Sequence, residues 1–103
     1  MKIVKAVSGV PIRLTPERML HIGSRHPEMH GEDDRILETV SAPDLVQEGD
    51  SGTLIALKHY ARTPLTEKFC AVVYRETGAS DGFVLTAYFT RQPASGRRIS
   101  WKR

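Results

Sequence analysis

The chain is poor in cysteine and in aromatic residues, and it has no long apolar segment. Its single cysteine, Cys70, excludes an internal disulfide framework and a cysteine-rich zinc knuckle, and it suits a reducing compartment. Apolar runs are far shorter than the roughly 20 residues that a membrane-spanning helix needs, and the N-terminus lacks the apolar region of a signal peptide. We therefore expect a cytoplasmic protein without a membrane partner.

Sequence motifs for nucleotides and metals are also missing. The chain has no Walker-type phosphate loop and no dinucleotide-binding fingerprint, so nucleoside triphosphates are not implied. His21 and His26 are five positions apart, roughly 140° around a helix, whereas two metal ligands on one helix face are usually four apart. Cys70 lies between apolar neighbours and is interpreted as a packing residue. We expect neither a metal nor a cofactor.

The residues that are present indicate one small globular domain, residues 1–103. Hydrophobic residues make up 40% of the chain and charged residues 26%, which is globular composition. The net charge of +3 is unevenly distributed: residues 1–27 carry +4, residues 28–50 carry −7, and residues 91–103 carry +5. The C-terminal segment contains no acidic residue, which favours a polyanionic partner.

Two helices are predicted in the first half of the chain. Thr15 and Pro16 have the character of an N-cap and a first helical residue, and Pro27 ends this helix. The acidic residues 32–34 complement the dipole at the start of a second helix, which ends at Pro43.

After Asp44 the hydrophobic period changes from that of a helix to two, which predicts strands. The main predicted strands are Leu45–Glu48, Leu54–Tyr60, Phe69–Tyr74 and Phe83–Arg91. An edge strand is predicted at Ile3–Val7, and a short last strand through Ile99 and Trp101. Ala61–Lys68 is predicted as a polar loop and Thr77–Gly82 as a turn.

These elements predict an α+β domain in which two N-terminal helices pack on one face of an antiparallel sheet of about four strands. In the strand from Phe83 to Arg91, alternation places Phe83, Leu85, Ala87 and Phe89 in the core. The opposite face is expected to be polar and to carry Thr86, Tyr88 and Thr90, with Lys58 and Tyr60 on a neighbouring strand and Arg91 at the strand end.

Three of the four histidines, His21, His26 and His30, lie within ten residues of one another. Histidine can give or take a proton near neutral pH. Cleavage of RNA by its own 2′-hydroxyl needs a base, an acid and cations that stabilise the phosphorane, but no cofactor. Histidines together with cations and hydroxyls therefore favour a metal-independent endoribonuclease.

The sequence also resembles a known family. Leu14–Arg18, His21–Ile22 and Arg25–Glu28 are similar to the helix signature of phage and bacterial domains in the barnase/EndoU/colicin/RelE-like ribonuclease superfamily. The downstream matches are Glu38–Thr39, Pro43–Asp44, Val72–Tyr74, the Thr86-Ala87-Tyr88 core of Phe83–Arg91, Gly96 and Trp101. The resemblance implies a RelE/barnase-like fold with two helices on an antiparallel sheet, and metal-independent RNA cleavage by a toxin or phage effector.

The resemblance also implies roles for individual residues. His21 and His26 match the helix histidines of the family, and Thr86 and Tyr88 match the hydroxyl pair on the strand. Our hypothesis gives His26 the role of base or acid and His21 the opposite role. Glu28 is placed to orient His26. The residues expected to bind phosphate or RNA are Arg25, Lys58, Arg91, Arg97 and Arg98, and His59 is an alternative to Lys58.

Three functions remain open at this point. The first is the endoribonuclease, with RNA as substrate and an acidic antitoxin or immunity protein as partner. The second is a non-catalytic module that binds RNA or protein through the same residues. The third is a phage accessory or structural domain that self-associates through its segregated charges.

Overall fold

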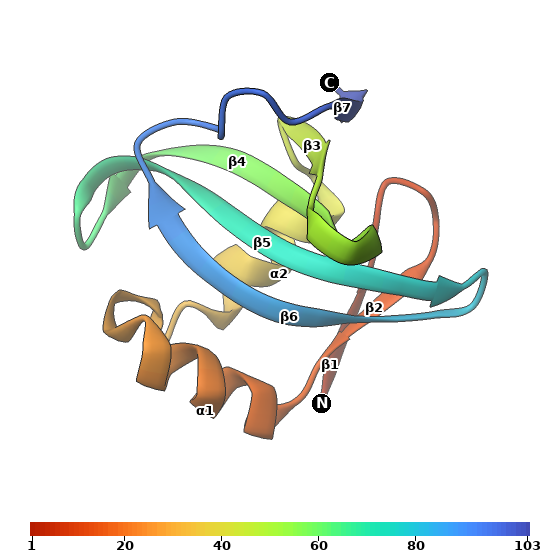
Figure 1. Ribbon diagram of the computed structural model, residues 1–103. Coiled ribbons are helices and arrows are strands. Elements are labelled where there is room, and N and C mark those ends of the chain that lie inside the picture. Colours follow the sequence, from red (N-terminus) through yellow and green to blue (C-terminus); the bar gives the residue numbers. More distant parts are fainter.

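The computed structural model describes residues 1–103 as a twisted sheet with two α-helices (Figure 1). The helices are α1 (Pro16–Arg25) and α2 (Asp33–Ser41), and short 3-10 turns are η1 (Pro27–Met29) and η2 (Asp50–Gly52). The strands are β1 (Lys2–Lys5), β2 (Pro11–Leu14), β3 (Leu45–Glu48), β4 (Leu54–Thr63), β5 (Thr66–Gly78), β6 (Asp81–Thr90) and β7 (Ile99–Lys102).

The sheet has seven strands in the order β1-β2-β6-β5-β4-β3-β7. All neighbours are antiparallel except β2 and β6, which run parallel and pair at Arg13 and Phe83. The predicted fold class, two N-terminal helices on a four-stranded antiparallel sheet, is therefore wrong: the sheet is mixed, and two strands precede the helices. The error began at Gly9 and Pro11, which suggested only a turn. Gly9, at a φ of 90°, reverses the chain so that β2 pairs with β1.

Both helices lie where the sequence predicted them. The Thr15 side chain accepts a hydrogen bond from the Arg18 backbone N–H at 3.1 Å, and Pro16 occupies the first turn. Helix α2 contacts β1, β4 and β5, while α1 contacts β6. Ile22 of α1 and Ile36 and Val40 of α2 are fully buried in the main core. Neither α-helix is long and apolar enough to cross a bilayer.

Strand β3 has the predicted bounds, whereas β4 and β5 are longer than the sequence predicted. Strand β4 extends to Thr63 and β5 starts at Thr66, so only a tight turn remains of the predicted loop Ala61–Lys68. Thr66 has a φ of 82°. The Thr63 hydroxyl accepts a hydrogen bond from the Leu65 N–H and donates one to the Thr66 carbonyl, which stabilises the turn. The polar composition of this segment concealed a hairpin, because its side chains are exposed on both faces.

A β-bulge in strand β6 changes which of its side chains face the core. The pairing partners shift between Tyr74 with Val84 and Val73 with Thr86, which leaves Leu85 as the extra residue. Val84, Ala87 and Phe89 therefore face the main core. The predicted alternation is correct at Ala87 and Phe89 but wrong at Phe83 and Leu85, which are only partly buried.

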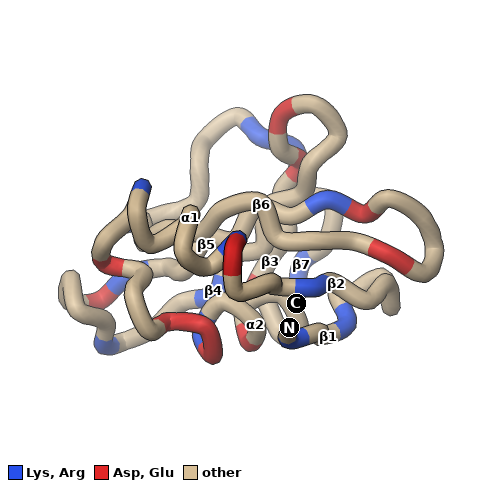
Figure 2. Tube along the Cα trace, turned by 90° about the horizontal axis from the view of Figure 1, so that it is seen from below, with Lys and Arg blue, Asp and Glu red and all other residues tan.

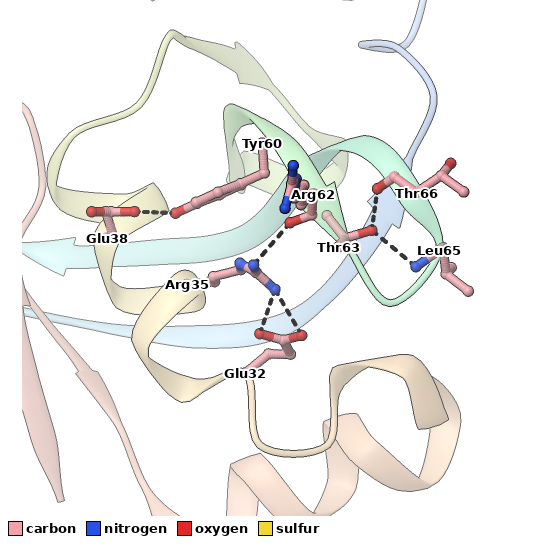
Figure 3. Close-up of polar contacts among 8 residues, drawn as sticks. All are labelled: Glu32, Arg35, Glu38, Tyr60, Arg62, Thr63, Leu65 and Thr66. Atoms are coloured by element: carbon pink, nitrogen blue, oxygen red, sulfur yellow. Dashed lines mark hydrogen bonds and ion pairs between the residues drawn. The ribbon is translucent and has the colours of Figure 1, made fainter.

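Helix α2 is fastened to the end of β4 by a polar cluster (Figure 3). One Arg35 nitrogen donates to both Glu32 carboxylate oxygens at 3.0 Å, and the other donates to the Arg62 carbonyl at 2.8 Å. The Arg35 guanidinium lies over the Tyr60 ring, 5.1 Å from its centroid, and the Tyr60 hydroxyl donates to Glu38. Burial and this hydrogen bond raise the pKa of Tyr60 above its ordinary range. The cluster fixes the β4–β5 hairpin against the helix.

Replacement of Arg35 by alanine is expected to lower the free energy of unfolding by about 1 to 2 kcal/mol, because the partly buried Glu32 carboxylate loses its charged donor. Urea unfolding monitored by circular dichroism measures the change. Arg35→Lys should recover little, since an ammonium group cannot reproduce the planar fork. Arg62→Ala is the matched control, because Arg62 contributes only its backbone carbonyl. Equal stability of the two alanine variants would contradict this role of Arg35.

Cys70 is fully buried in the main core. Burial raises the pKa of the Cys70 thiol to about 11, so the reactive thiolate is scarce at neutral pH. The prediction that Cys70 is a packing residue is confirmed.

Candidate functional site

The sheet face opposite α2, which we name the open face, has its own small apolar cluster. Ile55, Leu57 and Ala71 are its buried members. Leu45, Phe69, Val73 and Tyr88 pack around them and are partly buried. No helix residue contributes to this cluster, and Thr86, Tyr88 and Thr90 on this face are partly exposed.

The C-terminal end of α1 brings His26 to the open face. His26 is the C-cap of α1, and its backbone N–H donates to the Ile22 carbonyl at 2.8 Å. Its ring lies beside that of Tyr88 on β6, with 5.6 Å between centroids and 36° between planes. The Glu28 carboxylate is 3.8 Å from His26 Nδ1, and the His26 side chain is 36% exposed. An imidazole, a phenol and a carboxylate thus meet at one accessible edge of β6.

The other predicted catalytic residues are placed differently. Thr86 lies on the open face opposite Val73 and is partly exposed, two residues before Tyr88. His21 is exposed on α1 and forms no hydrogen bond or ring contact with Thr86 or Tyr88. It directly precedes the buried Ile22, which places it about 100° around the helix from that residue. The structure brings the His26 ring, but not that of His21, into contact with the ring of Tyr88.

The expected position of Lys58 and Tyr60 on the open face is wrong. Lys58 Nζ donates to the Ala42 carbonyl at the end of α2 at 3.0 Å, and Tyr60 bonds Glu38 on the same helix. Both therefore lie on the face that α2 covers. Since Leu57 belongs to the open-face cluster, alternation places His59 on the open face.

The predicted arginines fall into two groups. Arg25, Arg91 and Arg98 are exposed and have no acidic partner. Arg97 is paired with Asp50 at 3.1 Å, and this contact raises the pKa of Arg97. Arg91, Arg97 and Arg98 lie in the segment between β6 and β7. Gln47 also holds this segment, because its Nε2 donates to the Ala94 carbonyl at 2.8 Å.

The segments of opposite charge in the sequence meet in the structure, where Lys2 of β1 pairs with Asp34 of α2 at 3.9 Å and Arg103 pairs with Asp44 at 3.0 Å. Figure 2 shows basic positions along β1 and β2 and acidic positions beside α2. The basic end of the chain forms β7, where Trp101 pairs with Val46 and packs partly against the main core. Trp101 is thus engaged in packing. Arg97 and Arg103 pair with Asp50 and Asp44, so Arg91, Arg98 and Lys102 are the cations of this segment without an acidic partner.

The sequence interpretation missed two residues on the open face, Glu67 and Phe69. Phe69 was treated only as part of a strand, and Glu67 fell in the predicted loop. With His59 and Arg91 they line a hollow of about 450 Å³ at the end of the sheet. The sequence contained a signal for this face, since the alternation from Ile55 through Leu57 places His59 on it. The pairing partner of His59 on β5 is Phe69, which therefore lies on the same face.

A second hollow, of about 470 Å³, lies between β1 and the start of α1 and contains none of the predicted site residues. No group of three or more histidine, cysteine, aspartate or glutamate side chains is arranged to hold a metal ion. Comparisons of the chain with protein families, with curated proteins and with solved structures give no match. Its function is therefore inferred from its own residues.

Proposed function

We propose that the chain is a metal-independent endoribonuclease whose centre is the His26–Tyr88 contact. The observation that supports this most directly is the proximity of an accessible imidazole to a strand phenol, 5.6 Å between ring centroids, with a carboxylate 3.8 Å from the imidazole. His26 caps α1 and Glu28 lies in η1, whereas Tyr88 on β6 is far from both in the sequence. Groups of this kind can move protons and orient a phosphodiester without a cofactor.

In the proposed reaction, His26 accepts the proton of the ribose 2′-hydroxyl as its oxygen attacks the adjacent phosphorus. The bond from phosphorus to the 5′-oxygen breaks, and this oxygen takes up a proton from solvent. The products are a 2′,3′-cyclic phosphate and a 5′-hydroxyl end. The hydroxyls of Tyr88 and Thr86 bind the phosphate oxygens or the neighbouring base, and Glu28 orients the His26 ring.

Incubation of the purified protein with transfer RNA and total RNA in EDTA tests this proposal. We expect cleavage that leaves cyclic phosphate ends, and no cleavage of DNA of the same sequence, because DNA lacks the attacking hydroxyl. Cleavage only after addition of a divalent cation, or none at any RNA concentration, would contradict the proposal.

A non-catalytic RNA-binding module is the second candidate, and the uncompensated Arg91 and Arg98 favour it. It predicts salt-sensitive RNA binding without strand scission. For either function, an acidic antitoxin or immunity protein is the proposed protein partner, since it would cover the same cations. We further propose a cytoplasmic location, which is supported by the free, buried Cys70.

A further inference from the structure

The hollow at the end of the sheet lies between the β4–β5 hairpin and the end of β6. It is lined by charged side chains, an imidazole, a hydroxyl and an aromatic ring, namely His59, Thr66, Glu67, Lys68, Phe69 and Arg91. His59 Nε2 is 2.7 Å from Glu67 Oε2, and the His59 ring meets the Phe69 ring edge to face, with 5.2 Å between centroids. The His59 backbone N–H also donates to Asp44 at 2.7 Å. The imidazole is therefore held in place by a carboxylate and by a fixed strand.

The strand register places this hollow on the same face as Tyr88. Phe69 pairs with His59 on β4 and with Thr90 on β6, whereas Tyr88 pairs with Ala71, two residues further along β5. Phe69 and Tyr88 are thus diagonal neighbours, which lie about 7 to 8 Å apart on one face of a sheet. Both rings are partly exposed. Neighbouring bases of a single nucleic-acid strand can stack on two aromatic surfaces arranged in this way.

We propose that this hollow is a second nucleotide subsite, and that single-stranded RNA crosses the open face from His26 to Arg91. The inference rests on the proposed function, because it extends the His26–Tyr88 site by one nucleotide. One base stacks on Tyr88, and the next stacks on the rings of Phe69 and His59. Glu67 orients the His59 ring.

Arg91 supplies the phosphate contact of this subsite. It is exposed, lines the hollow and has no acidic partner, whereas Arg97 is already paired with Asp50. An arginine without an acidic partner can exchange the counterions of a phosphate for a direct contact, which makes binding depend on salt. An RNA duplex does not satisfy the site, since its bases are stacked inside the helix and cannot reach the two rings.

The test measures binding of a ten-nucleotide RNA in which every 2′-hydroxyl is methylated, so that affinity is recorded without cleavage. We expect Arg91→Ala and His59→Ala each to raise its dissociation constant about tenfold at physiological salt. Arg91→Ala should also reduce the slope of log affinity against log salt by about 0.7. Arg62→Ala is the matched control, an exposed arginine on β4 that does not line the hollow, and it should change neither quantity.

Equal affinities of the Arg91→Ala, His59→Ala and Arg62→Ala proteins would overturn the subsite, as would tighter binding of a blunt RNA duplex than of the single strand. Thermal unfolding measures whether each variant is folded. Arg91 is exposed, so Arg91→Ala decides the question if His59→Ala is unstable. The proposed function fails separately. A protein that binds the methylated strand through Arg91 and His59, but cleaves no unmodified RNA, retains the subsite and is not a nuclease.

Discussion

Replacement of His26 by alanine is expected to reduce the rate of RNA cleavage by a factor of about 10² to 10⁴, the usual contribution of a positioned acid or base. His26 is the only imidazole in ring contact with Tyr88. Because its side chain is about one third exposed, the folded structure should tolerate the change. The rate is measured under single-turnover conditions on a short RNA, alongside binding of the methylated strand, which should stay within about twofold of the parent protein.

His30→Ala serves as the matched control for this variant. His30 lies close to His26 in the sequence, but its ring packs on the α1 backbone at Gly23, away from Tyr88. Its loss should leave cleavage unchanged. His21→Ala distinguishes two arrangements: a small effect fits the placement of His21 on the exposed side of α1, whereas a loss equal to that of His26→Ala would restore the paired-histidine arrangement. Full activity of His26→Ala would eliminate the proposed centre.

Gly82→Ala is expected to lower the free energy of unfolding by about 3 kcal/mol, which corresponds to a fall of at least 10 °C, roughly, in the melting temperature. A Cβ atom at Gly82 would lie 2.7 Å from the Arg75 carbonyl oxygen and 2.5 Å from the Ile12 side chain. The carbonyl belongs to the backbone of β5 and cannot move aside without disturbing the sheet. Differential scanning calorimetry measures the effect.

The control for this prediction is Gly23→Ala. A Cβ atom at Gly23 would meet only the ring of His30, 2.7 Å away, which is the movable end of an exposed side chain. Alanine is also the better helix former, by about 1 kcal/mol. We expect Gly23→Ala to melt within a few degrees of the parent. If Gly82→Ala melts at the same temperature as the parent, the close packing of Gly82 against Ile12 and Arg75 does not contribute to stability, and the prediction is wrong.

The helices could be predicted from the sequence because their ends are encoded locally. The Thr15 cap, Pro16 and Pro27 define α1 without reference to the rest of the chain. The sheet could not be predicted in the same way. The pairing of Arg13 with Phe83 joins residues 70 positions apart, and nothing in the four residues of β2 specifies a parallel neighbour.

The site was predicted only in part, because some of its residues have a local signal in the sequence and others depend on strand register. His26 stands out through its position at a helix end, and Tyr88 through its alternation with buried residues. Whether Lys58 or His59 shares their face depends on one residue of register, and a one-residue error exchanges the two faces of a strand. The bulge at Leu85 had the same effect at the start of β6, and neither composition nor propensity reveals it.

The two edge strands of the sheet affect how the protein behaves at high concentration. The edge strands β1 and β7 are each four residues long, and they carry Lys2, Lys5 and Lys102. The unpaired amide and carbonyl groups of an edge strand can pair with a strand of another copy of the chain. Here such an addition would gain few hydrogen bonds and would bring like charges together. Growth of the sheet from one molecule into the next is therefore disfavoured, although Ile3 and Ile99 are exposed on these strands.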